Sequence, residues 1–283
     1  MYDRKEKLRK VFEDTQKYYT EDAALKAAVD NSRKNARVYP AGQLPDIAGK
    51  AADRAGKLRV TRSRTFEAAM KLHREFPDKK TAVLNFASAT RPGGGVTNGA
   101  GAQEECLCRC STLYPTLNTK YMWEHFYDVN RAMHDVMHTD ACIYSPGIVI
   151  CKTDEDIPQR MEPDKHVTVD VISCAAPNLR NLPANAYNPE SGSAVSATPD
   201  VQYKVHLQRA RQIMYVAAAN DADILVLGAF GCGAFRNDPY AVAEAYRTAM
   251  DEHRGLFDLV EFAVYCSDRD TGNYEAFRRK LTK

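Results

Sequence analysis

Two adjacent carboxylates, Glu104 and Glu105, follow a glycine-rich stretch that begins at Gly93-Gly94-Gly95. Glycines adopt backbone angles that a Cβ excludes, and they let main-chain N–H groups approach a ligand closely. A glycine loop that leads into a helix also offers unpaired N–H donors and the positive end of the helix dipole, the usual setting for phosphate. Carboxylates repel phosphate. The combination therefore suits a substrate in which the glycine loop binds an anionic group and the carboxylates act on a different bond, such as a glycosidic bond near a diphosphate.

Two familiar phosphate-binding motifs are excluded by the residues around these glycines. No Lys-Ser or Lys-Thr follows them, which excludes the P-loop. The spacing does not match G-x-G-x-x-G either, so a Rossmann-type fold loses its main support. One alternative stays open, a flexible surface loop before an ordinary helix whose acidic first turn complements the dipole.

The spacing of the glycines and carboxylates resembles a known catalytic loop. The pattern of GGG, seven residues and QEE, from Gly93 to Glu105, looks like the catalytic loop of the poly(ADP-ribose) glycohydrolases. The flanking text VLNFASATRPGGG at 83–95 and a second glycine loop, LGAFGCGAF at 227–235, resemble the microbial type of that family, a branch of the macrodomain fold. The resemblance covers the chain from about Val60 onward.

This resemblance implies an activity and a role for each carboxylate. The reaction would be hydrolysis of the ribose–ribose O-glycosidic bond, acting from chain ends and releasing ADP-ribose. It needs an acid to protonate the leaving hydroxyl and support for an oxocarbenium-like ribose. By resemblance Glu105 donates that proton and then activates water, while Glu104 orients the ribose hydroxyls. Two acids so close should raise the pKa of at least one of them.

The other candidate residues would bind the substrate. The resemblance implies that the second loop wraps the diphosphate and that Phe235 packs on a ribose, with an ordinary core aromatic as the alternative. Asn85 should lie at a strand end and position ribose, or else cap a turn, and Gln103 should shape the loop. Arg91 is either a phosphate contact or a solvated charge. The full substrate-binding set is Asn85, Gly93, Gly94, Gly95, Gln103, Gly231, Cys232, Gly233, Ala234 and Phe235.

No metal or other cofactor is expected, because the bound diphosphate can offset the developing positive charge. The one tempting metal motif is Cys106-x-Cys108-x-Cys110. On a helix Cys106 and Cys110 share a face while Cys108 points elsewhere, so the three thiols would not converge on one ion.

Length and charge set the wider bounds. The 283 residues suit one large α/β domain with an extension. With 39 basic and 37 acidic residues, bulk charge indicates neither a membrane surface nor sequence-specific nucleic acid as partner. The expected partners are poly(ADP-ribose), ADP-ribose and ADP-ribosylated proteins. The start is charged and no run of eighteen apolar residues occurs. We expect an intracellular, cytoplasmic monomer, or a nuclear one in a eukaryote.

Hydrophobic periodicity predicts the elements that would position these motifs. A strand at 81–86 leads into the first glycine loop, and a strand at 223–228 leads into the second, with Asp238 as the N-cap of the next helix. Strands alternating with helices predict a macrodomain-like three-layer α/β/α sandwich with a mixed, mostly parallel sheet. Further strands are expected at 57–62, at the sheet edge, and at 143–152, 166–174 and 259–266; helices are expected at 3–19, 21–30, 65–75, 103–113, 121–137, 201–220 and 274–281.

The chain also divides by pattern. Residues 1–57 read as an N-terminal helical and irregular extension. It is an irregular or extended connection from Asn31 to Leu58, and it is more typical of a structural brace than of a functional site. Residues 58–283 read as the macrodomain-like catalytic domain. Residues 177–199 are rich in Pro, Asn, Ser and Ala, which suits a lid or rim of the site, or else surface disorder.

Two other functions remain as alternatives, because the macrodomain fold alone does not decide function. One is a non-catalytic ADP-ribose-binding domain. The other is a hydrolase of another ADP-ribosyl linkage, such as a mono-ADP-ribosyl adduct. The intact Glu104-Glu105 pair favours an enzyme, since a pure binder has little use for carboxylates beside a diphosphate.

Overall fold

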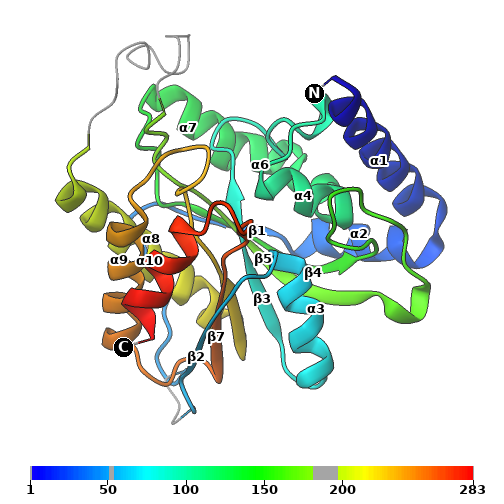
Figure 1. Cartoon of the computed structure of the whole chain (residues 1–283). Helices are drawn as coiled ribbons and strands as arrows, with labels where there is room; N and C mark the ends of the chain where they lie inside the picture. The colour runs from blue at the N-terminus through cyan, green and yellow to red at the C-terminus, as the bar shows by residue number, and fades with distance from the viewer. Residues whose placement is uncertain (1, 51–53, 181–196, 283) are drawn as a thin grey trace.

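A computed structural model describes residues 2–50, 54–180 and 197–282 of the chain. Within them, a seven-stranded sheet runs through the centre in the order β1-β4-β5-β3-β6-β7-β2 (Figure 1). The pairs from β5 through β3, β6 and β7 to β2 are parallel, whereas β1–β4 and β4–β5 are antiparallel, so the predicted mixed, mostly parallel sheet is confirmed. The strands are β1 (Arg37–Tyr39), β2 (Lys57–Thr61), β3 (Thr81–Ala87), β4 (Cys142–Ile150), β5 (Val167–Ala175), β6 (Ile224–Leu227) and β7 (Leu259–Ala263).

Helices cover both faces of this sheet, as Figure 1 shows. Successive side chains of a strand point to opposite faces, and in β3 Val83 packs into one hydrophobic core while Ala82 and Leu84 pack into the other. The predicted three-layer sandwich is therefore confirmed. The Val83 face is covered by α1 (Tyr2–Glu21), α3 (Thr65–Glu75), α4 (Gln103–Cys110) and α5 (Leu113–Leu117), and the opposite face by α8 (Pro199–Ala219), α9 (Pro239–Glu252) and α10 (Gly272–Leu281).

Two predicted helices are shorter than their periodicity indicated. The helix expected at 103–113 ends at Cys110, because Ser111 is extended and its hydroxyl donates to the Leu107 carbonyl, which closes the last turn. The helix expected at 121–137 is broken into α6 (Lys120–Met122), a π-helical turn at Trp123–Tyr127 and α7 (Asp128–Met133). It stops where His134 adopts a left-handed conformation with φ of 52°.

The connection expected to be irregular or extended from Asn31 to Leu58 begins with helix, so the prediction was wrong for its first residues, whereas the strand β1 fits an extended connection. Helix α2 (Ala23–Asn35) continues past residue 31, and β1 pairs with β4 as an edge strand of the sheet. The last residues of α2 include Asn31, Ser32 and Asn35. Asn and Ser are poor helix formers, so the sequence did not indicate that the helix continues to residue 35. No helix within the described residues is long and apolar enough to cross a membrane.

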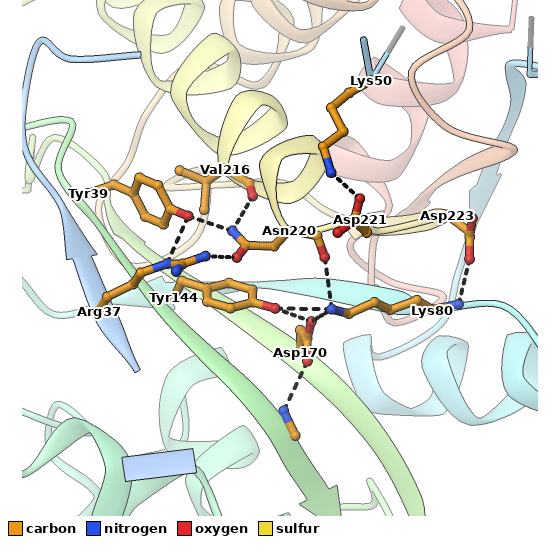
Figure 2. A network of polar contacts seen from close by, with 11 residues as sticks. Arg37, Tyr39, Lys50, Lys80, Tyr144, Asp170, Val216, Asn220, Asp221 and Asp223 are labelled. Atoms are coloured by element: carbon orange, nitrogen blue, oxygen red, sulfur yellow. Dashed lines mark hydrogen bonds and ion pairs between the residues drawn. The ribbon is translucent and has the colours of Figure 1, made fainter. Parts of the chain in front are cut away.

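Three cations from residues 37–54 contact the turn between α8 and β6, and Figure 2 shows two of them, Arg37 and Lys50. Arg37 donates to the Asn220 side chain, Lys50 pairs with Asp221, and the Arg54 guanidinium lies 2.7 Å from the Asp223 carboxylate. Beneath them, the Lys80 ammonium lies 3.0 Å from the buried Asp170 carboxylate. This network lies at the amino-terminal ends of β3 and β6, whereas the two glycine loops follow the carboxyl ends of the same strands.

Candidate active site

The two glycine loops lie side by side because β3 and β6 are parallel neighbours and each loop follows the carboxyl end of its strand. Ligands bind at this edge in open α/β sheets. The rings of Phe86 and Phe230, one from each strand end, lie 5.6 Å apart. A cleft of about 800 Å³ opens here, and its lining includes Phe86, Ala87, Gly101, Ala102, Gln103, Cys106, Gly231, Gly233, Ala234, Phe235 and Tyr265.

The first glycine loop wraps the two carboxylates. Gly93 and Gly94 are left-handed, with φ of 64° and 55°. A Cβ added to Gly94 would lie 2.5 Å from Glu105 Oε1 and 3.1 Å from Glu104 Oε2, so one glycine touches both acids. The Gly95 N–H donates to Glu105 Oε1 at 2.8 Å. These glycines therefore allow close approach to the carboxylates of the same chain, in addition to any ligand.

Glu104 is the more deeply buried carboxyl, 3% exposed. Its Oε2 accepts from the Ser88 N–H at 2.8 Å and its Oε1 from the Asn85 amide at 3.2 Å. Burial raises the pKa of Glu104 to about 8, and the neighbouring charge of Glu105 adds to that rise. The prediction that one of the adjacent acids has a raised pKa is confirmed, and Glu104 holds a proton at neutral pH.

Glu105 is 7% exposed and is held through one oxygen only. Its Oε1 accepts the Gly95 N–H, whereas Oε2 has no hydrogen-bond partner among the described residues. Neither Glu104 nor Glu105 lines the cleft; the wall next to them is formed by Gln103 and Cys106. The carboxylates thus lie directly behind the cleft wall, with one oxygen of Glu105 uncommitted.

Two side chains join the carboxylate helix α4 to β3. The Gln103 amide oxygen accepts from the Phe86 N–H at 2.8 Å, and its amide nitrogen donates to the Leu84 carbonyl at 2.8 Å. Gln103 therefore sets the start of α4 against the strand end. Asn85 is fully buried, and its amide nitrogen donates to Ser173 at 2.9 Å as well as to Glu104. It supports Glu104 from behind.

The second glycine loop is fixed by residues that the sequence analysis did not single out. Gly231 is left-handed, with φ of 78°, and an added Cβ would lie 2.8 Å from the Asn237 amide nitrogen. That amide donates to the Gly231 carbonyl at 3.0 Å and the Pro177 carbonyl at 2.7 Å, and the Asn237 oxygen lies 2.8 Å from His206 Nε2. Burial lowers the pKa of His206 to about 3, so its ring is neutral. The position of Asn237, just before the predicted N-cap Asp238, was the available signal.

The residues of this second loop do not all face the cleft. Gly231, Gly233, Ala234 and Phe235 line it. The Cys232 thiol instead lies 3.6 Å from the Phe230 carbonyl oxygen, to which it donates, and burial raises its pKa. Phe235 is partly buried and receives the Arg180 guanidinium 5.6 Å from its ring centre.

The cleft lining also includes an aromatic and charged group that no sequence motif indicated. Tyr265, 57% exposed, follows β7, and the Arg64 guanidinium lies over its ring at 4.2 Å. Arg64 also pairs with Asp156. The buried Asp154 accepts from the Phe66 N–H at 2.9 Å at the start of α3, and burial raises its pKa. These residues come from three separate segments, so only the fold brings them together.

Of the remaining sequence candidates that the structure describes, only Cys106 lines the cleft. Arg91 is exposed on the first loop. Cys108 and Cys110 are buried in the core, whereas the Cys106 thiol receives a hydrogen bond from Arg109. Among the described residues, no group of His, Cys, Asp and Glu side chains could hold a metal ion. Most of the candidate lid at 177–199 lies outside the described residues.

Comparisons with known proteins agree on one family. Residues 8–153, which contain the first glycine loop and both carboxylates, match the family described as "Microbial-type PARG, catalytic domain". A poly(ADP-ribose) glycohydrolase from Deinococcus radiodurans, solved with ADP-ribose, is 35% identical, with a TM-score of 0.75 over 90% of this chain and 97% of that one. The enzyme from Thermomonospora curvata, solved with the inhibitor ADP-HPD, is 27% identical, with a TM-score of 0.78 over 97% and 99%. A comparison with curated proteins gives no match.

Proposed function

The chain belongs to the microbial-type poly(ADP-ribose) glycohydrolase family, and from this premise we propose that it removes ADP-ribose units one at a time from the ends of poly(ADP-ribose). It is a glycoside hydrolase that acts on this polymer. The observation that carries the proposal is the buried Glu104-Glu105 pair, set by glycines behind a cleft large enough for a nucleotide. A domain that only bound ADP-ribose would gain nothing from that pair.

Glu105 serves as the acid and then the base of the reaction. Its unpartnered Oε2 gives a proton to the ribose oxygen that leaves, so that the C–O bond breaks toward an oxocarbenium-like ribose. A water molecule then attacks the anomeric carbon and returns its proton to Glu105, which restores the starting state. The Gly95 N–H holds the other oxygen at 2.8 Å and keeps the carboxylate from rotating.

Glu104 orients the ribose hydroxyls as a neutral acid. With a pKa of about 8 it is mostly protonated at pH 7. A protonated carboxyl can donate as well as accept, which suits recognition of hydroxyl groups.

The rest of ADP-ribose occupies the cleft. The second glycine loop binds the diphosphate through the backbone around Gly231 and Gly233, and Phe235 packs on a ribose. Tyr265 offers an exposed ring in the cleft lining, and stacking on such a ring suits a base. The negative diphosphate offsets the positive charge that develops at the reacting ribose.

We also propose the cellular setting and the domain division. All eight cysteines are free thiols, including Cys142 and Cys174, which lie opposite each other on β4 and β5. Thiols so placed stay reduced in the cytoplasm, where ADP-ribosylated proteins would be the partners. Residues 1–57 form an extension of the catalytic domain at 58–283.

The test incubates purified protein with poly(ADP-ribose), without added metal, and resolves the products by chromatography. We expect the wild type to release free ADP-ribose. Glu105→Gln should keep its affinity for ADP-ribose in calorimetry while kcat falls by about a hundredfold or more, the scale of a general acid–base group. Oligomeric fragments as first products would refute action from chain ends. Intact polymer with ADP-ribose still bound would favour a binding domain or another linkage.

A further inference from the structure

The first helix of the extension lies against the catalytic loop. In Figure 1, α1 runs beside α4, the helix that carries the two carboxylates. A Cβ added to Gly99 would lie 2.1 Å from the Lys5 carbonyl oxygen, so only glycine allows this approach of the two backbones. The Leu8 side chain lines the cleft beside Gly101. The extension therefore reaches the loop between the glycine triplet and Glu105.

A buried arginine connects α1 with this loop. Arg109 is 1% exposed, and its Nη1 donates to the Ala100 carbonyl at 2.6 Å while Nη2 donates to the Cys106 thiol at 3.3 Å. Its own carbonyl oxygen accepts the Thr15 hydroxyl of α1 at 2.6 Å. No carboxylate pairs with Arg109 among the described residues.

A buried guanidinium without a carboxylate costs free energy, because its charge has left water. Hydrogen bonds to a backbone carbonyl and a thiol recover only part of that cost. A neutral side chain of similar size would fill the space in the core at a lower cost. What the guanidinium adds is a fixed position for the Ala100 carbonyl.

The Ala100 carbonyl leads to the catalytic carboxylate in two steps. The Ala100 N–H donates to the Gly95 carbonyl at 3.1 Å, and the Gly95 N–H donates to Glu105 Oε1 at 2.8 Å. Arg109 itself lies one helical turn after Glu105 on α4. The hydrogen bonds thus form a closed ring from Glu105 through Gly95 and Ala100 to Arg109 and back along the helix.

A second route joins α1 to the beginning of the triplet. The Phe12 ring of α1 meets the Tyr114 ring edge-on, with centroids 5.0 Å apart. Tyr114 lies against Gly93, where an added Cβ would be 2.8 Å from its ring. The first glycine loop therefore contacts Tyr114 at Gly93 and Arg109 at Ala100, and α1 contacts both of these residues.

We propose that Arg109 is a positioning residue for Glu105, and that α1 completes the catalytic loop by holding Arg109 and Tyr114. This inference rests on the proposed function of Glu105. The extension then sets the geometry of the reaction as well as the stability of the domain, which goes beyond the brace expected from its sequence.

The main test is a double-mutant cycle between Arg109 and Glu105, read in kcat. Arg109→Met should lower kcat by about thirtyfold to a hundredfold, because a carboxylate displaced by roughly 1 Å loses up to about a hundredfold in rate. The Kd for ADP-ribose, from calorimetry, should stay within about threefold. Arg109 lines the cleft but is only 1% exposed, and its two terminal nitrogens already donate to the Ala100 carbonyl and the Cys106 thiol. Arg109→Lys should recover part of the rate, because its ammonium can still donate to a carbonyl. In a Glu105→Gln background, Arg109→Met should change the residual rate by less than about threefold.

Lys80→Met is the matched control. It removes a cation from the buried Asp170 at the opposite edge of the sheet, so it should lower the melting temperature and leave kcat unchanged. Two outcomes would mean that Arg109 only stabilises the fold and would overturn the proposal. One is that Arg109→Met lowers kcat by the same factor in the wild type and in Glu105→Gln. The other is that Lys80→Met lowers kcat as much as Arg109→Met does. Thr15→Val, which removes only one hydroxyl from α1, gives the same test if Arg109→Met does not fold, with an expected loss of about threefold to tenfold.

Hydrogen exchange separates this inference from the proposed function. Mass spectrometry of the peptide covering 93–105 should show faster amide exchange in Arg109→Met than in wild type, and no change in Lys80→Met. A wild type that leaves poly(ADP-ribose) intact would refute the proposed function alone, and the exchange result would still decide whether Arg109 fixes the loop. Unchanged exchange in Arg109→Met would refute the positioning role.

Discussion

Replacing Gly94 by alanine tests the contact between the glycine triplet and the two carboxylates. The new Cβ would lie 2.5 Å from Glu105 Oε1, and ordinary contact begins at 3.4 Å, so the oxygen must retreat by about 0.9 Å. The carboxylate is the end of a flexible side chain and can move without unfolding the protein. A shift of this size at a reacting group costs roughly a hundredfold in rate, which is about 2.7 kcal/mol of activation free energy. The left-handed backbone adds about 1 kcal/mol of strain to the folded state.

Gly42→Ala is the matched control for that strain. Gly42 is also left-handed, with φ of 70°, but an added Cβ would meet nothing within 4 Å. Both variants should therefore melt a few degrees below the wild type, by about 2–4 °C for 1 kcal/mol in a domain of this size. Only Gly94→Ala should lose kcat on poly(ADP-ribose), measured as ADP-ribose released. If Gly94→Ala keeps kcat within about threefold of Gly42→Ala, the triplet does not set the position of Glu105.

The other two predictions concern the proton on Glu104 and the second loop. The pKa of Glu104 rises from 4.5 to about 8 on folding, so the folded protein binds this proton more tightly than the unfolded chain. The contribution of the proton to the free energy of unfolding is therefore complete below pH 4.5 and is lost as the pH rises through 8. Glu104→Gln, which cannot ionise, should therefore flatten the fall of the melting temperature between pH about 5 and about 9; equal slopes for both proteins would place the proton elsewhere. Gly231→Val should raise the Kd for ADP-ribose by about tenfold or more, because its Cβ would lie 2.7 Å from Ala176 and push the loop out of shape. Unchanged affinity in calorimetry would argue against this loop as the phosphate cradle.

The sequence predicted the main frame of the site because its signals are local. Continuous apolar runs before each glycine loop indicated β3 and β6, since a strand buried on both faces has no polar alternation. Asp238 announced the start of α9, and its side chain does accept the Tyr240 N–H at 2.8 Å. Two strands of one parallel sheet end at the same edge, so the meeting of the two loops followed from their strands alone.

Residues that act through distant partners could not be predicted in this way. Arg109 looks like an ordinary helix residue, and its importance depends on Ala100 and on Thr15, which is 94 positions away in the chain. His206 and Asn237 meet only after α8 has packed beside the second loop. Tyr265 becomes part of the cleft because β7 lies next to β6. Periodicity also missed the π-helical turn at Trp123–Tyr127, since one extra residue in a turn barely disturbs a short apolar pattern.

The difference between the two glutamates shows the same limit on a smaller scale. They are adjacent and chemically identical, so the sequence predicts a raised pKa without saying which one carries it. On α4, one residue corresponds to a rotation of about 100°. That rotation turns Glu104 toward β3, where Asn85 and Ser88 enclose it, and turns Glu105 toward Gly95. Gln103 fixes the rotation by bonding to both sides of Asn85 on the strand. The assignment of one buried proton and one free carboxylate oxygen therefore depends on the register of a single helix, which Gln103 and Arg109 hold from its two ends.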